Sequence, residues 1–198
     1  MAMRAQTSLY FVAVVTLLAV LFVSRTALAQ NAPTDASTSP WVAAAKKYRV
    51  DVLDLYALAL RESSLKRSDG AVRAWPWTLC TPQTGALYFE SYDAALAKLT
   101  ELIAQGTRNI DIGLMQVNWR WNGHRLPDPK RLLLPEHNIE IAAQILRENL
   151  DAFGGDLRLA IARYHNPRSE LGIPYAASVL AIREYLRNDR NIEQSLQR

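Results

Sequence analysis

The fold is decided by one stretch, Asp51-Val52-Leu53-Asp54-Leu55-Tyr56-Ala57-Leu58-Ala59-Leu60-Arg61-Glu62-Ser63-Ser64. The Asp51 side chain can accept a hydrogen bond from the first turn of a helix, which makes it a candidate N-cap. Apolar residues then recur at helical spacing on one face, at Val52, Leu55, Tyr56 and Ala59. This pattern predicts an amphipathic helix that is closed by Ser68-Asp69-Gly70.

Glu62 lies on the apolar side of this predicted helix, three residues after Ala59 and four after Leu58. A carboxyl group in that position loses hydration, which disfavours the anion and raises the pKa. A general acid that works near neutral pH needs such a raised pKa, so Glu62 is the candidate catalytic residue. The alternative is an ordinary glutamate at a helix end, paired with Arg61 or Lys66.

A second polar cluster is Asp111-Ile112-Gly113-Leu114-Met115-Gln116-Val117-Asn118. Gly113 permits backbone conformations that larger residues resist, and Gln116 and Asn118 offer donors and acceptors to an amide or a sugar hydroxyl. Trp119 and Trp121 follow, with aromatic faces that suit sugar rings. The alternative is a plain turn that leads into a core strand or helix.

Tyr164 lies on an apolar stripe, beside His165 and Asn166. A buried tyrosine hydroxyl needs a hydrogen-bond partner. We predict that the Tyr164 hydroxyl bonds either the Glu62 carboxyl or a sugar. The alternative is a tyrosine that only packs in the core.

The remaining pattern predicts a single, mainly helical domain with one inserted β-hairpin. Further helices are expected at 40–48 and 139–153, and one is expected to begin at a cap at Ser91 and end at Gly106. Two more are expected after Asp156 and after Pro174. The section at 109–135 is expected to be rich in loops. Alternating apolar residues predict the hairpin at 75–89. Because Trp75 and Trp77 put aromatic surface on a two-stranded unit that is marginal alone, we hypothesise that the hairpin is a lid or a docking element.

The amino terminus has the pattern of a secretory signal peptide. Arg4 precedes an apolar run of 15 residues at 9–23, and Ala27-Leu28-Ala29 offers a cleavage site. The run is shorter than the roughly 20 residues that a membrane-spanning helix needs, so an uncleaved anchor is the less favoured alternative. We therefore expect a signal peptide at 1–29, a flexible leader at 30–39, a domain at 40–187 and a polar tail at 188–198. The mature protein is expected in the periplasm, without a membrane span.

Composition excludes several other classes. Of the 198 residues, 49% are hydrophobic, and 23 Lys and Arg against 19 Asp and Glu leave a net charge of only +4. Basic residues are not clustered densely enough for a nucleic-acid binder. Cys80 is the only cysteine, and His124, His137 and His165 lack the spacing of metal ligands, so we expect no disulfide within the chain, no metal and no cofactor.

Four segments occur in order, Ala-Leu-Arg-Glu62-Ser63-Ser64, then Ile112-Gly113-Leu114-Met115-Gln116-Val117-Asn118, then Pro135-Glu136-His137-Asn138-Ile139, then Ala162-Arg163-Tyr164-His165-Asn166. Over about residues 40–187 this succession resembles the catalytic domain of the soluble lytic transglycosylases, the goose-lysozyme-like branch of the lysozyme fold. The Glu-Ser pair and the Gly-Leu-Met-Gln motif are its most specific parts. The resemblance implies an α+β lysozyme-like fold.

The resemblance also implies an activity, cleavage of the β-1,4 bond between N-acetylmuramic acid and N-acetylglucosamine in peptidoglycan. Glu62 would protonate the leaving oxygen and then deprotonate the muramic 6-hydroxyl, which closes a 1,6-anhydro ring. The substrate's N-acetyl group would take the place of the second carboxylate that ordinary glycosidases use. The substrate-binding residues implied are Ser63, Gly113, Met115, Gln116, Asn118 and Tyr164.

The predicted hairpin is similar to the insert of transglycosylases tied to conjugation and pilus-type secretion systems, which makes components of such systems candidate partners. One departure is that the family usually reads Tyr-Asn-x-Gly where this chain has Tyr164-His165-Asn166-Pro167. Two alternatives stay open. One is a hydrolytic muramidase that uses Glu62, Asp111 and a water, and the other is a catalytically idle wall-binding assembly factor.

Overall fold

The computed structural model of the protein describes residues 3–4, 39–68, 70–189 and 196. The predicted signal peptide, leader and tail fall almost wholly outside these residues. The described residues are mainly helical with small antiparallel sheets, which confirms the predicted α+β class.

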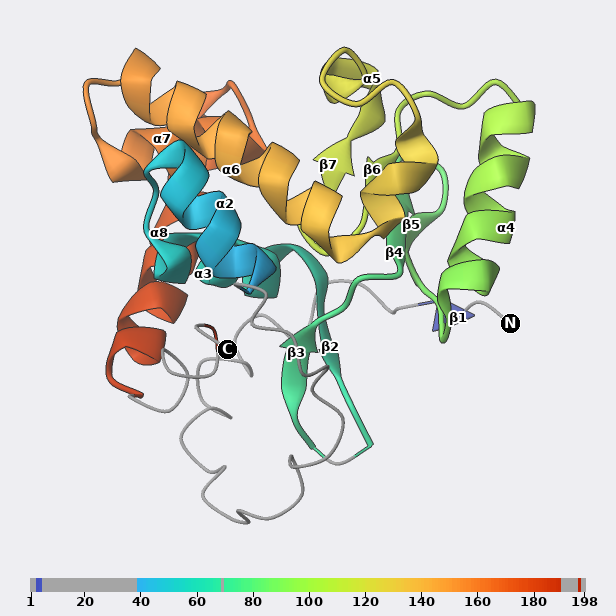
Figure 1. Ribbon diagram of the computed structural model, residues 1–198, viewed down its shortest axis with the longest axis horizontal. Helices are drawn as coiled ribbons and strands as arrows, with labels where there is room; N and C mark the ends of the chain where they lie inside the picture. Colours follow the sequence, from blue (N-terminus) through green and yellow to red (C-terminus); the bar gives the residue numbers. More distant parts are fainter. Residues whose placement is uncertain (1–2, 5–38, 69, 190–195, 197–198) are drawn as a thin grey trace.

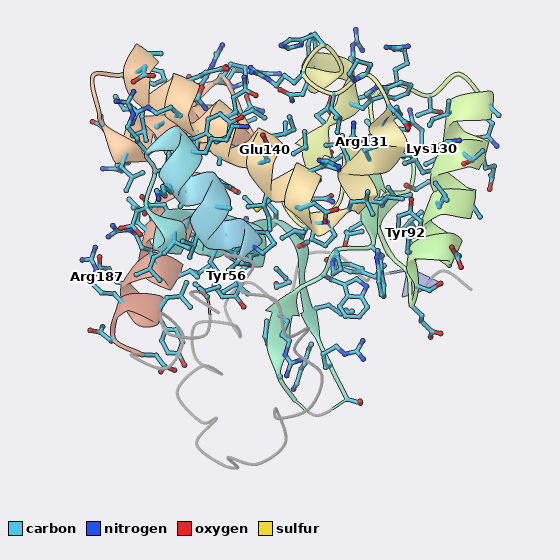
Figure 2. The ribbon with its side chains drawn as sticks, viewed as in Figure 1. Tyr56, Tyr92, Lys130, Arg131, Glu140 and Arg187 are labelled. Atoms are coloured by element: carbon cyan, nitrogen blue, oxygen red, sulfur yellow. The ribbon has the colours of Figure 1, made fainter. Side chains whose placement is uncertain are left out.

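Five helices form one side of the molecule (Figure 1): α2 (Pro40–Tyr48), α3 (Val52–Ser63), α6 (Pro135–Ala152), α7 (Leu157–His165) and α8 (Ser169–Arg187). α8 packs against α3 and α7, and α6 packs against α2 and α7. Buried Leu55, Leu58 and Leu146 lie in the core between them. At the surface, Lys47 and Tyr48 of α2 donate to Glu140 of α6, which is labelled in Figure 2.

The predicted helix starts at Asp51, Ser91 and Asp156 are confirmed. Asp51 accepts from the Leu53 amide at 2.8 Å at the start of α3. Ser91 caps α4 (Tyr92–Ala104) in the same way, and Asp156 caps α7. Short polar side chains at these positions accept hydrogen bonds from the first amides of a helix, which otherwise have no partner. Because these bonds are local, such caps can be predicted from sequence.

The prediction that the last helix begins after Pro174 is wrong, because α8 begins at Ser169 and contains Pro174. Gly172 lies so close to α7 that a Cβ atom there would be 2.6 Å from the Ala162 carbonyl oxygen. Packing against α7 therefore holds this turn helical, at the cost of the one hydrogen bond that proline cannot donate.

The second side of the molecule contains a five-stranded antiparallel sheet of order β1-β5-β4-β6-β7, flanked by α4 (Figure 1). The strands are β1 (Met3–Arg4), β4 (Thr78–Thr81), β5 (Gly85–Tyr88), β6 (Asp111–Ile112) and β7 (Val117–Asn118). The connections after β7 contain α5 (Trp119–Asn122) and the 3-10 helix η1 (Pro129–Leu133). β1 belongs to the predicted signal peptide, so cleavage there would leave β5 at the sheet edge.

The predicted hairpin is present as β4 and β5, and its hypothesised role as a lid or a docking element stays a prediction. β4 pairs with β6 on its other side, and Leu79 pairs with both Leu87 and Ile112. These three side chains belong to the buried core. The hairpin is therefore an integral part of the sheet that positions β6.

A second hairpin, of β2 (Ser64–Lys66) and β3 (Val72–Ala74), was not predicted. Its turn includes Gly70, whose φ of +83° suits glycine. Four of these six strand positions are exposed and none is buried, so the strands lack the buried apolar face by which sequence reveals strands.

Candidate active site

Glu62 lies in the last turn of α3, half-buried, and accepts a hydrogen bond from the Tyr175 hydroxyl of α8. The distance between Tyr175 Oη and Glu62 Oε1 is 2.5 Å. Burial raises the pKa of Glu62 from 4.5 to about 7. The Tyr175 bond and the charge of Arg61 lower this pKa, and the charge of Asp111 raises it, but burial is the largest influence. Loss of hydration, more than any neighbouring charge, therefore sets the pKa of Glu62.

Tyr175 is itself firmly held. It is 4% exposed, and its ring stacks on that of His165, with 4.2 Å between ring centroids and 6° between planes. Arg61 Nε donates to Ser178 Oγ at 3.0 Å, and Ser178 Oγ donates to the Tyr175 carbonyl at 2.6 Å. Burial and the nearby Glu62 charge raise the pKa of Tyr175 well above its ordinary value, so its hydroxyl remains a donor.

Tyr164 does not make the predicted bond to Glu62. Its hydroxyl donates to the Met115 carbonyl at 2.9 Å, and the phenol that bonds Glu62 is that of Tyr175. Both tyrosines lie on apolar stripes of their helices, so the signal that suggested Tyr164 was equally present at Tyr175. Which one reaches Glu62 depends on how α7 and α8 pack. The predicted contact between Tyr164 and a sugar stays a prediction.

The Gly113–Gln116 segment is a tight turn between β6 and β7. Gly113 has a φ of +80°, and a Cβ atom there would lie 2.5 Å from both the Leu132 carbonyl oxygen and Asn138 Nδ2. Gln116 has a φ of +46°, and its side chain donates to the Gly113 carbonyl at 2.7 Å and the Thr78 carbonyl at 3.3 Å. The turn is therefore fixed in two ways. Gly113 leaves no room for a larger residue, and the Gln116 side-chain amide bonds backbone carbonyls of the turn and of β4.

Asn138, at the start of α6, positions the turn and is absent from the predicted site set. It is fully buried, and its Oδ1 accepts from the Met115 amide at 2.7 Å. Its Nδ2 donates to the Ile112 and Leu132 carbonyls, each at 2.8 Å. One side chain thus satisfies three backbone groups around the turn. The sequence offered one signal for this role, because Asn138 is a polar residue directly before Ile139, where the apolar stripe of the helix begins.

Two more predicted residues hold the same region. Ser63, directly after Glu62, is fully buried, donates to the Leu114 carbonyl at 2.7 Å and accepts from the Trp75 amide at 3.2 Å. Asn118 donates to Asp111 Oδ1 at 2.8 Å and caps α5. The turn is therefore tied to the helix end that carries Glu62. Direct contact of a substrate with Ser63, Gly113, Met115, Gln116, Asn118 or Tyr164 stays a prediction.

Asp111 is the second carboxyl group that affects the site. It is half-buried at the start of β6, and burial raises its pKa, although the Asn118 hydrogen bond opposes the shift. Its charge raises the pKa of Glu62. Asp111 therefore helps to keep Glu62 protonated.

A family model for the transglycosylase SLT domain matches residues 39–172. The chain belongs to the transglycosylase SLT domain family. No curated protein and no solved structure matches it significantly. Membership confirms the resemblance noted in the sequence, and it implies a transglycosylase-type enzyme whose substrate is peptidoglycan.

The matched part of the SLT domain includes Glu62, the 113–116 turn and Tyr164, but ends before Tyr175. The residue that holds the Glu62 carboxyl thus lies beyond the segment by which the family is recognised. In the part of the chain that the structure describes, the helices are all too short or too polar to cross a bilayer. Over the same residues, His, Cys, Asp and Glu side chains form no group of three suited to a metal ion.

Proposed function

We propose that this SLT-domain protein is a lytic transglycosylase, which cleaves the β-1,4 bond between N-acetylmuramic acid and N-acetylglucosamine and leaves a 1,6-anhydromuramic end. One observation carries the proposal. A single carboxyl group, Glu62, lies half-buried beside a phenol donor, and its pKa of about 7 lets it both give and take a proton at neutral pH.

In the first step, protonated Glu62 donates its proton to the glycosidic oxygen. The bond from this oxygen to C1 of the muramic ring breaks, and the N-acetylglucosamine strand leaves as an alcohol. The carbonyl oxygen of the muramic N-acetyl group bonds to C1, which spreads the positive charge into an oxazolinium ring. Glu62 is now a carboxylate, stabilised by the hydrogen bond from Tyr175.

In the second step, the Glu62 carboxylate takes the proton of the muramic 6-hydroxyl. The freed oxygen attacks C1, the bond to the N-acetyl oxygen breaks, and the 1,6-anhydro ring closes. Glu62 ends protonated and ready for another cycle, and no water is consumed. The mass of the released sugar ends tests this proposal, because an anhydro end is lighter by one water than a hydrolysed end.

The hydrolytic alternative assigns Asp111 to activate a water. The geometry favours another role for Asp111, since its carboxylate already accepts from Asn118 and its charge raises the pKa of Glu62. A catalytically idle wall-binding protein has no need of a buried carboxyl group that titrates near pH 7. The hydrolytic alternative predicts reducing muramic ends, and the idle alternative predicts no cleavage.

We also propose that the protein acts in the periplasm, where it opens the wall for a conjugation or pilus-type apparatus. The signal-peptide pattern supports export, and the β4–β5 hairpin supports the subgroup. N-terminal sequencing of the exported protein is expected to begin at Gln30. An intact Met1 on membrane-bound protein would contradict export as a processed protein.

A further inference from the structure

A hollow of about 500 Å³ lies outside the residues of the candidate active site. It is formed where the end of α4, the segment leading to β6, the β4–β5 turn and α5 come together. α5 and the end of α4 lie at the same edge of the molecule in Figure 1. Its polar lining side chains are Gln83, Gln105, Thr107, Arg108, Asn109 and Arg120. We call it the Arg108–Arg120 hollow.

The hollow carries positive charge and lacks a carboxylate of its own. Arg108 and Arg120 both line it and are both exposed. Their guanidinium carbons lie over tryptophan rings, 4.4 Å from the centroid of Trp119 and 4.9 Å from that of Trp121. Among the residues described here, ion pairs engage other arginines, such as Arg125, but neither of these two. Both guanidinium groups are thus positioned and available to an anion.

The hollow is joined to the active-site turn by direct bonds. Asn109 in its lining accepts from Asn118 at 2.8 Å, and the same Asn118 side chain donates to Asp111. The Trp119 amide donates to the Ile110 carbonyl at 2.9 Å. Beside the hollow, Trp121 is 67% exposed. The segments that lead into and out of the turn therefore carry two cations and several amides, with an open aromatic face beside them.

We propose that the Arg108–Arg120 hollow binds a free carboxylate of the acidic stem peptide attached to the glycan strand, an inference that rests on the proposed function. The glycan backbone offers hydroxyl and acetamido groups but no carboxylate once the peptide is attached, whereas the peptide carries free carboxylates. Guanidinium groups bind carboxylates through paired, charge-assisted hydrogen bonds. The lining amides of Gln83 and Gln105 suit the peptide bonds beside such a carboxylate.

The test is the double variant Arg108→Gln/Arg120→Gln, compared with Lys46→Gln/Arg158→Gln, which removes the same charge from exposed sites on α2 and α7. Each protein is assayed on intact strands and on strands whose free peptide carboxylates have been converted to amides. On intact strands we expect the first variant to raise KM about tenfold with kcat unchanged, and the control variant to match the parent. On amidated strands all three proteins should share the high KM.

Three outcomes overturn the inference. They are an unchanged KM of Arg108→Gln/Arg120→Gln on intact strands, an equal loss on both substrates, and the same loss in the control variant. If the parent cleaves neither substrate, the proposed function fails, and calorimetry with the synthetic stem peptide then decides. Binding by the parent but not by the arginine variant supports the hollow as a carboxylate site, whereas equal binding or no binding overturns it.

Discussion

Replacing Glu62 by glutamine is expected to lower the rate of peptidoglycan cleavage by at least about 10²–10⁴-fold, the range attributed to general acid–base catalysis. The amide keeps the size of the side chain, and its oxygen still accepts from Tyr175, but it neither gives nor takes a proton. Affinity for uncleaved glycan strands should therefore stay close to that of the parent. Full activity in Glu62→Gln would remove Glu62 from the mechanism.

The Glu62→Gln variant also tests how the partly buried charge of Glu62 affects stability as the pH changes. The folded-state pKa of Glu62, about 7, lies above its ordinary value of 4.5, so the folded protein binds this proton more tightly than the unfolded chain. The contribution of Glu62 to stability is therefore present below pH 4.5 and is lost as the pH rises through 7. We expect Glu62→Gln to have a higher Tm than the parent at pH 8, with the difference closing toward pH 4.5. A parent Tm equal to that of the variant at every pH would mean that Glu62 is not desolvated.

Tyr175→Phe is expected to lower kcat about tenfold and to move the alkaline limb of the pH–rate profile to higher pH. The lost hydrogen bond stabilised the Glu62 carboxylate, so its removal raises the pKa of Glu62 further above 7. The tenfold effect corresponds to about 1.4 kcal/mol, a typical size for one hydrogen bond to a charged group. The pH dependence of kcat, measured for parent and variant, checks both parts.

Tyr185→Phe is the matched control, because Tyr185 lies on the same helix but is 44% exposed. It should leave both kcat and the alkaline limb unchanged. If Tyr175→Phe also leaves the limb in place, Tyr175 only packs in the core, and another group sets the pKa of Glu62.

The parts of the fold that sequence predicted are those governed by local chemistry. Asp51, Ser91 and Asp156 cap helices through bonds to residues two or three positions away. The predicted start of α8 was wrong because Gly172 packs closely against Ala162 of another helix, α7. This contact between helices overrides the local signal of Pro174. Helix starts are thus predictable from sequence unless another element supplies the missing stabilisation.

The residues of the candidate site also differ in whether one helix or the packing of several helices determines them. Glu62 was predictable because its place on an apolar helix face is a property of a single helix. Its partner was not, since Tyr164 and Tyr175 lie on equally apolar stripes and only the packing of α8 against α3 selects Tyr175. Asn138 was missed because its three bonds reach backbone groups that only the folded chain brings together.

The oxygen source of the new sugar end tests the central claim most directly, because one carboxyl group suffices only if the substrate supplies its own nucleophile. Peptidoglycan is digested by the parent protein in water enriched in oxygen-18, and the released ends are weighed by mass spectrometry, with Glu62→Gln as the blank. The account predicts 1,6-anhydromuramic ends, lighter by one water than hydrolysed ends and free of oxygen-18. Reducing muramic ends that carry one oxygen-18 atom would contradict it and assign the water-activating role to Asp111.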